Sequence, residues 1–171
     1  MTVTRSPATT STGIQIRQVD QIFDLGMGDP VQALQKVDLD IPRGSFVSIV
    51  GPSGCGKSTL LKVLADLLQP TSGQVIIEGQ TPGDLRRQGR IGLVFQQANL
   101  LPWRNITQNI ALMRELVGER GIPVGNALDP SELIEVVGLK GFESKYPHQL
   151  SGGMQQRAAL ARALLLDPAL L

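Results

Sequence analysis

The chain has 171 residues, 42% of them hydrophobic and 18% charged, which is the composition of one ordinary globular domain and excludes a wholly disordered chain. Sixteen basic and fifteen acidic residues give a net charge of +1, so no strong field recruits nucleic acid or an anionic membrane. A single cysteine, Cys55, excludes an internal disulfide and fits a reducing cytoplasm, and no apolar run approaches the roughly 18 residues of a membrane span.

The first part of the sequence predicts strands followed by one helix. Residues 1–13 are rich in serine and threonine and predict a mobile tail, whereas 14–23 and 31–41 alternate apolar with polar residues, as half-buried strands do. The dense apolar run FVSIVG from Phe46 is typical of a strand buried on both faces. Residues 57–68 carry leucine and valine at helical spacing, and QPTSG ends that helix.

The second part predicts two more strands and then helices. QVIIEG and IGLVFQ are typical of strands, and a helical pattern runs from about 105 to 141, interrupted by GERGIPVGNALDP. Asp129, followed by Pro130 and Ser131, is well suited to begin the helical segment SELIEVVGL. A last helix is expected from Ser151 to about 166.

A glycine-rich loop before the first helix predicts a phosphate-binding site. The sequence GPSGCGKS satisfies the pattern G-x-x-x-x-G-K-[ST] in the required strand-to-helix context. Its glycines allow consecutive N–H groups to turn inward, where the helix N-terminus adds partial positive charge. Lys57 is expected to reach the β- and γ-phosphates of a nucleotide, and the Ser58 hydroxyl to bind the bridging Mg²⁺. The predicted nucleotide-binding residues are Gly51, Ser53, Gly54, Cys55, Gly56, Lys57, Ser58 and Thr59.

A second glycine motif opens the last predicted helix. Ser151 is a good N-cap, and after Gly152 and Gly153 the residues are apolar at helical spacing. Free N–H groups and the serine hydroxyl at such a helix end form another potential anion site. By itself, the motif fits a capped helix after a turn better than it fits an anion site.

Together with Gln96, at the end of a predicted strand, these motifs resemble the ATP-binding subunits of ABC transporters. GPSGCGKST resembles Walker A, Gln96 the Q-loop glutamine, and LSGGMQQRAALARAL the ABC signature, in the order of that family. The resemblance covers nearly the whole chain from Ile14 to Leu171. It implies an α/β P-loop NTPase of the ABC ATPase type over 14–171, with an N-terminal antiparallel β subdomain, a parallel core sheet and a helical subdomain at about 100–160.

The resemblance also implies ATP and Mg²⁺ as cofactors and a head-to-tail homodimer that closes when ATP binds. Gln96, the expected catalytic residue, would sense the attacking water and contribute to the Mg²⁺ site. Phe23 matches the aromatic residue that stacks on adenine, and a phenylalanine of the core fits the sequence equally well. The signature of one chain would cover the γ-phosphate held by the other chain, through Ser151, Gly152, Gly153, Met154 and Gln155.

The motifs are most similar to those of importer ATPases for nitrate, sulfonates and taurine. This implies a membrane permease and a solute-binding protein as partners, no nucleic acid, and a cytoplasmic location at the inner face of the cell membrane through the permease. A different class, a nucleotide-binding module without hydrolysis or a defunct fragment, stays open. An ATPase of the DNA-repair type is disfavoured, because the stretch between the two glycine motifs has no sustained heptads and no cysteine pairs.

The family pattern continues beyond Leu171 into the Walker B aspartate and the catalytic glutamate, which have no match here. The switch histidine is also unmatched, because His148 precedes the signature and is expected to be a surface or packing residue. Hydrolysis in this class needs a carboxylate that polarises the attacking water. We therefore expect a truncated chain with an incomplete sheet that does not hydrolyse ATP, and we expect Asp167 to be a turn residue at a helix end.

Overall fold

The computed structural model shows two compact units, Met1–Asp84 and Leu85–Leu171. It describes residues 2–5, 12–24, 26, 29–122 and 127–171. The first unit contains five strands and one helix, which are β1 (Thr2–Arg5), β2 (Thr12–Phe23), β3 (Val31–Pro42), β4 (Val47–Val50), α1 (Lys57–Leu64) and β5 (Ser72–Ile77). From the boundary onward the elements are helical, and they are α2 (Pro82–Arg87), α3 (Ile106–Glu119), α4 (Pro130–Val136), the 3₁₀ helix η1 (Pro147–Gln149) and α5 (Gly152–Leu164).

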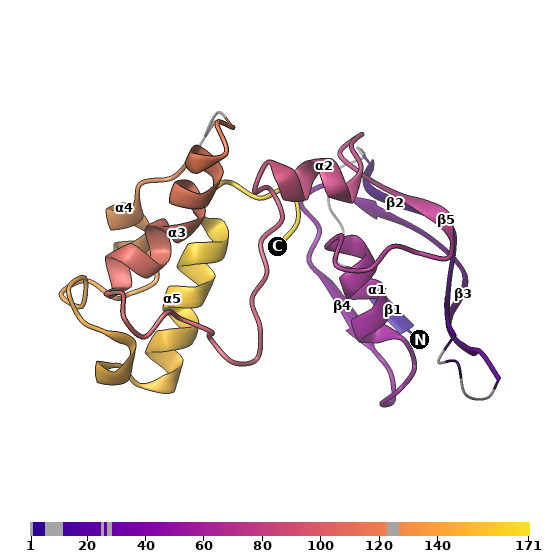
Figure 1. Ribbon diagram of the computed structural model, residues 1–171, viewed down its shortest axis with the longest axis horizontal. Helices are drawn as coiled ribbons and strands as arrows, with labels where there is room; N and C mark the ends of the chain where they lie inside the picture. The colour runs from indigo at the N-terminus through magenta and orange to yellow at the C-terminus, as the bar shows by residue number, and fades with distance from the viewer. Residues whose placement is uncertain (1, 6–11, 25, 27–28, 123–126) are drawn as a thin grey trace. The chain divides into compact units, whose positions relative to one another are not determined.

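Three strands of the first unit form an antiparallel sheet in the order β3-β2-β5 (Figure 1). The predicted alternation is confirmed in β2, where Ile14 and Ile16 are buried. A register shift between Arg17 and Asp20 marks an irregularity in the strand, and Val19, which lies within this stretch, is fully buried. The antiparallel β subdomain expected from the sequence is therefore present.

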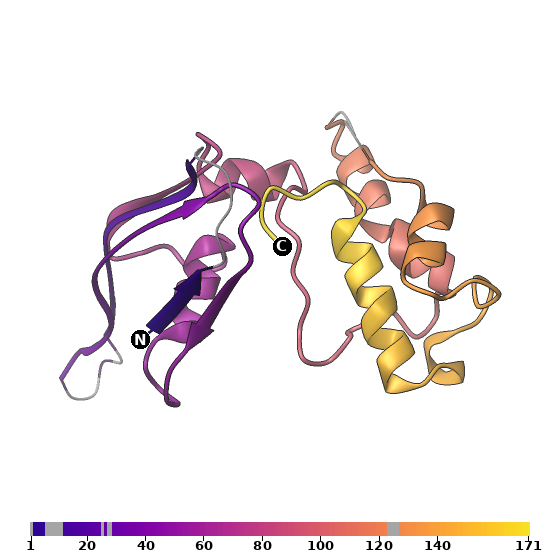
Figure 2. The same cartoon turned by 180° about the vertical axis from the view of Figure 1, so that it is seen from behind.

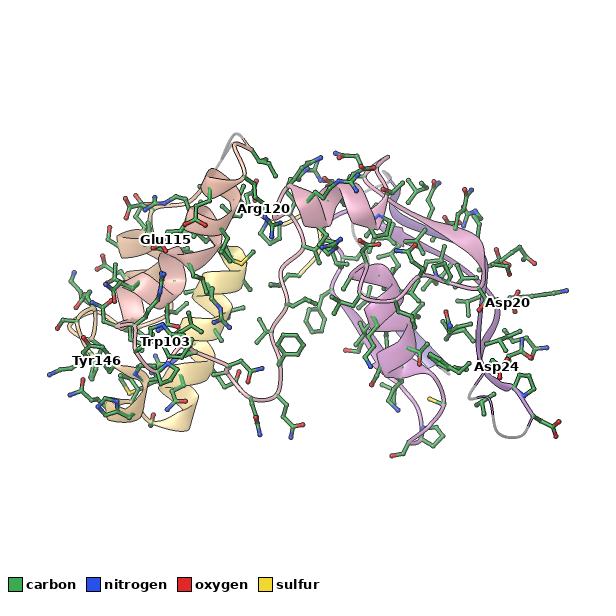
Figure 3. The ribbon with its side chains drawn as sticks, viewed as in Figure 1. Asp20, Asp24, Trp103, Glu115, Arg120 and Tyr146 are labelled. Atoms are coloured by element: carbon green, nitrogen blue, oxygen red, sulfur yellow. The ribbon has the colours of Figure 1, made fainter. Side chains whose placement is uncertain are left out.

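Asp20 fastens both outer strands to the central one (Figure 3). Its carboxylate accepts hydrogen bonds from the Lys36 N–H at 2.9 Å and Gln32 Nε2 at 3.2 Å on β3, and from Ser72 Oγ at 3.0 Å on β5. The Lys36 N–H and then the Ser72 hydroxyl hold the pKa of this carboxyl below its usual value, because they stabilise the charged form. The sheet is thus joined by a side chain as well as by its backbone ladder.

The second unit packs α3, α4 and α5 around one apolar cluster (Figure 2). Its most deeply buried members include Ile106 and Ile110 of α3, Ile134 of α4 and Ala161 of α5. These helices were predicted from their apolar spacing, and all three are confirmed. No helix in the described part of the chain has the length and apolar character needed to cross a membrane.

Polar side chains cap the start of all three helices, and the caps at Asp129 and Ser151 were predicted from the sequence. Asp129 accepts from the Ser131 N–H at 2.7 Å at the start of α4, and Ser151 accepts from the Met154 N–H at 3.4 Å at the start of α5. At the start of α3, Asn105 and Gln108 form a reciprocal capping box. Each cap satisfies an N–H group that the helix itself leaves unpaired.

Two predictions about strands are wrong. Val47–Val50 is not buried on both faces, since it pairs with β1 alone among the described strands and Val50 is 59% exposed. Residues 91–96 form no strand, and Ile91 makes a single parallel bridge to Leu170. A strand is buried on both faces only where other elements cover both sides of its sheet, and Val50 is not covered in this way among the described residues. The expected parallel core sheet is therefore represented by this bridge alone in the part of the chain described.

The predicted tail and one helix also differ from the structure. Within the expected tail, Thr2–Arg5 form β1 and residues 12–13 begin β2, while 6–11 lie outside the described residues. Threonine and valine favour strands, so Thr2–Arg5 pair with β4 although residues 1–13 are rich in polar residues. The short helix α2 was not predicted, although Thr81, Pro82 and Asp84 form a recognisable start, in which Thr81 Oγ1 accepts from the Asp84 N–H at 3.2 Å.

Candidate nucleotide-binding site

The loop between β4 and α1 folds as its glycines predict. Gly54 and Gly56 have φ angles of +82° and +93°, in the left-handed region that favours glycine. At Gly56 a Cβ atom would lie 2.5 Å from the Ala33 carbonyl oxygen on β3, whereas at Gly54 it would meet nothing within 4 Å. Gly56 therefore serves both the turn of the loop and its close approach to the sheet.

The N-terminus of α1 is open to a ligand. Gly56, its N-cap, supplies no side-chain hydrogen bond, and the first turn holds no acidic residue. The Leu60 N–H bonds to the Gly56 carbonyl at 2.9 Å, so the N–H groups that precede it belong to the unpaired end of the helix. Uncapped N–H groups together with the helix dipole favour an anion such as phosphate.

Lys57 holds the loop in its curved shape. Its ammonium donates to the carbonyl oxygens of Gly51 and Pro52, both at 2.7 Å, and lies 3.7 Å from Cys55 Sγ. A cation is thus fixed at the mouth of the loop, beside the open helix end. Phosphate oxygens approaching that helix end would meet the ammonium as well, and the role of Lys57 in binding them stays a prediction.

The residues around the loop fit Mg²⁺ only as part of a metal–nucleotide complex. The Ser58 side chain, on the first turn of α1, is exposed and has the hydroxyl that hard cations accept. No group of three or more metal-ligating side chains exists among the described residues. Since Mg²⁺ is commonly bound through one or two protein ligands together with phosphate oxygens, this set suits Mg²⁺ held by a nucleotide.

Phe23 is half-buried at the end of β2, opposite Val31 of β3. Ile22 beside it is 41% exposed, so the strand here has left the fully buried core. An aromatic ring in this position has one part packed and another accessible. Stacking of Phe23 on adenine stays a prediction.

The second unit brings Gln96 and the signature together. A cavity of about 410 Å³ is lined by Gln96, Gln97, Ala98, Asn99, Leu100, Pro147, Gly152, Gln155 and Gln156. The Gln96 side chain is exposed, and the backbone carbonyl oxygen of Gln96 accepts a hydrogen bond from Gln156 Nε2 of α5. The predicted catalytic glutamine therefore lies beside the helix that carries the signature.

The signature residues divide into an open end and a supporting part. Ser151, Gly152 and Gly153 are exposed, and a Cβ on either glycine would meet nothing within 4 Å. Gln155 Nε2 donates to the carbonyl oxygens of Pro147 at 2.9 Å and Leu150 at 3.2 Å, and Met154 packs on the apolar cluster. The first three residues present a surface, and the next two hold it in place.

Three further residues of the second unit, His148, Asp167 and Trp103, have clear places in the structure. His148 is exposed and stacks on Tyr146, with ring centroids 6.0 Å apart, as expected for a surface residue. Asp167 has φ +48°, and its N–H bonds to the Leu164 carbonyl at 3.0 Å, which confirms a turn at the end of α5. Trp103 is 71% exposed on the second unit (Figure 3).

Two arginines on α5 were missed by the sequence analysis. Arg157 Nη1 donates to the carbonyl oxygens of Val137 and Gly138, at 2.8 and 3.0 Å. Arg162 donates to those of Asn99 and Ala98, at 2.9 and 3.0 Å. Their acceptors are backbone carbonyls, which leave no pattern of residue types in the sequence, so no signal could have found these bonds.

The chain is similar to transport ATPases along most of its length. Residues 34–171 match the ABC transporter family. The taurine import ATP-binding protein TauB of Roseobacter denitrificans is 45% identical over 92% of this chain and 57% of its own length. The nitrate import ATP-binding protein NrtC of Synechococcus elongatus is 44% identical over 94% of this chain and 24% of its own length. The chain thus spans little more than half the length of the taurine relative.

A solved structure supports the same assignment. The ATP-binding cassette MJ0796, in a dimeric post-hydrolysis state bound to ADP and Pi, is 33% identical with a TM-score of 0.69, covering 91% of this chain and 70% of that one. The predicted fold class, a P-loop NTPase of the ABC ATPase type with an incomplete sheet, is confirmed by this likeness. Family match, sequence identity and shared fold together assign the chain to the ABC transporter ATP-binding family.

Proposed function

We propose that this chain is the ATP-binding, energy-coupling part of an importer for a small solute of the nitrate, sulfonate or taurine kind. The relatives named for taurine and nitrate import support this class of solute. ATP binding closes two copies head to tail in this proposal, and hydrolysis in the whole protein reopens them. The dimeric state of the solved cassette supports the pairing of two copies.

The observation that carries the proposal is the open N-terminus of α1 beside the Lys57 ammonium. The phosphate chain of ATP would lie against the N–H groups of the first turn, with Lys57 on the β- and γ-phosphates. Bound Mg²⁺ would neutralise charge on those phosphates, with Ser58 and Gln96 as its protein ligands. Phe23 would stack on adenine. The remaining loop contacts would come from Gly51, Ser53, Gly54, Cys55, Gly56 and Thr59.

The signature acts on the partner copy in this proposal. Ser151, Gly152 and Gly153 would cover the γ-phosphate bound by the other copy, supported by Met154 and Gln155. The exposed glycines of α5 support this role, because a flat helix end admits a close neighbour. The helical subdomain at about 100–160 would present that surface within the ATP-binding domain at 14–171.

The whole protein would hydrolyse ATP, whereas these 171 residues would bind ATP and Mg²⁺ without turnover. The reason is chemical, since the sequence holds no match for the family's catalytic glutamate. The further partners in this proposal are a membrane permease and a solute-binding protein. The chain would then lie in the cytoplasm, attached to the inner face of the membrane through the permease.

Sedimentation of the chain with and without nucleotide tests the proposal. ATP with Mg²⁺ is expected to shift monomer to dimer, whereas ADP leaves a monomer. Phosphate release, measured on the same samples, is expected to stay at the background rate. A chain that neither binds ATP nor changes its mass with ATP would contradict the proposed function.

A further inference from the structure

Two polar side chains are buried among the described residues, and they differ in how fully they are hydrogen-bonded. Asn109 is fully buried, its Oδ1 accepts from the Leu101 N–H at 2.7 Å, and its Nδ2 donates to three backbone carbonyls at 2.9 to 3.1 Å. Gln21 of β2 is 5% exposed, and its Oε1 has no hydrogen-bond partner in the described part of the chain. Because buried acceptors without a donor are rare in folded proteins, the Gln21 oxygen points to a donor that arrives from outside the chain.

The backbone at the end of β2 fixes the orientation of the Gln21 amide. Its Nε2 donates to the Ile22 carbonyl at 3.2 Å, and that carbonyl also accepts from Thr71 Oγ1 at 3.4 Å. The Thr71 hydroxyl in turn accepts from the Ile22 N–H at 3.0 Å, so the strand is held at this point. Turning the amide over would set its oxygen against the Ile22 carbonyl and lose the Nε2 hydrogen bond. Gln21 therefore offers an acceptor, and a ligand that satisfies it must supply a donor.

The Gln21 side chain lies on the face of the sheet that meets the phosphate loop. It is opposite Leu34 of β3, and directly opposite residues of an antiparallel pair share a face. The Leu34 side chain is buried against Gly56, where an added Cβ would lie 3.0 Å from Leu34 Cδ2. The register shift after Gln21 skips Ala33 on β3, so the alternation along β2 continues and places Phe23 on this face as well.

A nucleotide held by the phosphate loop would bring hydrogen-bond donors to this face. Its phosphate oxygens are acceptors, and the N–H groups of α1 and the Lys57 ammonium serve them. Its donors lie on the nucleoside half, where the ribose carries hydroxyls and adenine carries the 6-amino group. Residues 21 and 23 are about 7 Å apart along a strand, so a nucleoside that lies on the Phe23 ring is close enough to approach Gln21.

We propose that Gln21 determines nucleotide specificity, because its Oε1 accepts a hydrogen bond from the nucleoside half of ATP, from either the adenine 6-amino group or a ribose hydroxyl. This inference rests on the proposed function, since the phosphate loop must hold the nucleotide. Gln21 is shielded in the chain alone, so the donor reaches it when a neighbour on the same face moves. Phe23, half-buried and next along this face, is that neighbour. A nucleotide without the donor leaves the buried oxygen unpartnered and binds more weakly.

Calorimetric titration of the full 171-residue chain with four nucleotides tests the proposal and identifies the donor. The nucleotides are ATP, ITP, 2′-deoxy-ATP and 3′-deoxy-ATP, each with Mg²⁺. ITP has a carbonyl in place of the 6-amino group, and each deoxynucleotide lacks one ribose hydroxyl. One of the three analogues is expected to bind about tenfold more weakly than ATP, and its identity names the donor. Equal affinities for all four nucleotides would overturn the proposal. A chain that binds none of them would contradict the proposed function and this inference with it.

Substitutions at position 21 separate recognition from a purely structural role. Gln21→Leu removes the acceptor at similar volume, so it is expected to bind ATP about tenfold more weakly and the discriminated analogue with unchanged affinity. Gln21→Met repeats the test, so that the result does not depend on the folding of one variant. Gln15→Leu is the matched control, because Gln15 is half-buried on the same strand but on the other face from Ile16. Preference for ATP that persists in Gln21→Leu or Gln21→Met would overturn the proposal.

Urea denaturation without nucleotide gives a second readout for the same variants. Gln21→Leu is expected to leave the urea midpoint unchanged or raise it, because the variant buries no unpartnered oxygen. Loss of ATP affinity without loss of stability is the result that a structural role alone does not give. A lowered midpoint would show that the oxygen already has a donor without nucleotide, and this would also overturn the proposal.

Discussion

The two glycine motifs each open a helix, yet the two helix ends are prepared differently. At α1 the N-cap is Gly56, no side chain caps the helix, and the Lys57 ammonium lies within the loop. At α5 the Ser151 hydroxyl accepts from the helix's own Met154 N–H, although at a long 3.4 Å. The first end is thus prepared to hold an anion within one chain. At the N-terminus of α5, the Ser151 hydroxyl already pairs with one of the free N–H groups. This fits a surface that binds phosphate only when a partner copy presents it.

The largest effect is expected from removing the cation at α1. Lys57→Ala should weaken ATP binding about 100-fold or more, because charged hydrogen bonds to two phosphates are lost. Titration with a fluorescent ATP analogue measures this, and Lys62→Ala, an exposed lysine in the last turn of the same helix, is the control. Equal affinities for Lys57→Ala and Lys62→Ala would remove the distinction between the two helix ends.

Blocking the end of α5 should separate binding from dimerisation. Ser151→Arg is expected to leave the ATP affinity of the monomer unchanged and to abolish the ATP-dependent dimer, because a long cationic side chain covers Gly152 and Gly153. Sedimentation with ATP measures the dimer. Ser151→Ala controls for the lost cap, which is expected to cost about 1 kcal/mol of unfolding free energy. Weaker ATP binding by the Ser151→Arg monomer would contradict the assignment of α5 to the partner's nucleotide.

Gly54 and Gly56 of the phosphate loop offer a matched pair of substitutions for measuring stability. Gly54→Ala should cost about 1 kcal/mol of unfolding free energy, for a Cβ at positive φ. Gly56→Ala should cost about 1–3 kcal/mol more, because its Cβ also meets the Ala33 carbonyl. Urea denaturation measures both variants. Equal costs would mean that the loop does not approach β3 as closely as the structure shows.

The smallest effect is expected at α4, whose N-cap is a carboxylate. Hydrogen bonds from the Ser131 hydroxyl and N–H hold the pKa of Asp129 below its usual value of 3.8. A lowered pKa in the folded state means that the stabilisation is complete above the unfolded pKa and is lost as pH falls through the folded pKa. Asp129→Asn should therefore flatten the decline of the urea midpoint below about pH 4. If the urea midpoint of Asp129→Asn declines as steeply as that of the unchanged chain, the Asp129 cap does not contribute to the loss of stability at low pH.

Local patterns were enough to predict most elements of the fold. Strand alternation in 14–23 and 31–41, and the caps Asp129 and Ser151, depend on residues close in sequence. The run IGLVFQ was predicted as a strand because apolar density reports burial, and it does not report whether a pairing partner exists. The same limit explains why the run from Phe46 was expected to be buried on both faces.

The candidate site also has one part that could be predicted from the sequence and one part that could not. The phosphate loop was predictable, because its geometry is set by glycines and a lysine within eight consecutive residues. The attachment of residues 96–99 to α5 was not, because Arg162 and Gln156 bond to backbone carbonyls about sixty residues away. Any residue type supplies such a carbonyl, so sequence alone does not identify the acceptor.

Chemical-shift mapping of ATP and Mg²⁺ on the ¹⁵N-labelled chain tests the central claim most directly. At concentrations that keep the chain monomeric, the account predicts that backbone amides of Gly54 to Thr59 shift with saturable dependence on ATP. Amides of Ser151 to Gln155 should then shift only when dimer forms at higher protein concentration. Shifts centred on α5 in the monomer, or none in the phosphate loop, would contradict the claim that the N-terminus of α1 binds ATP.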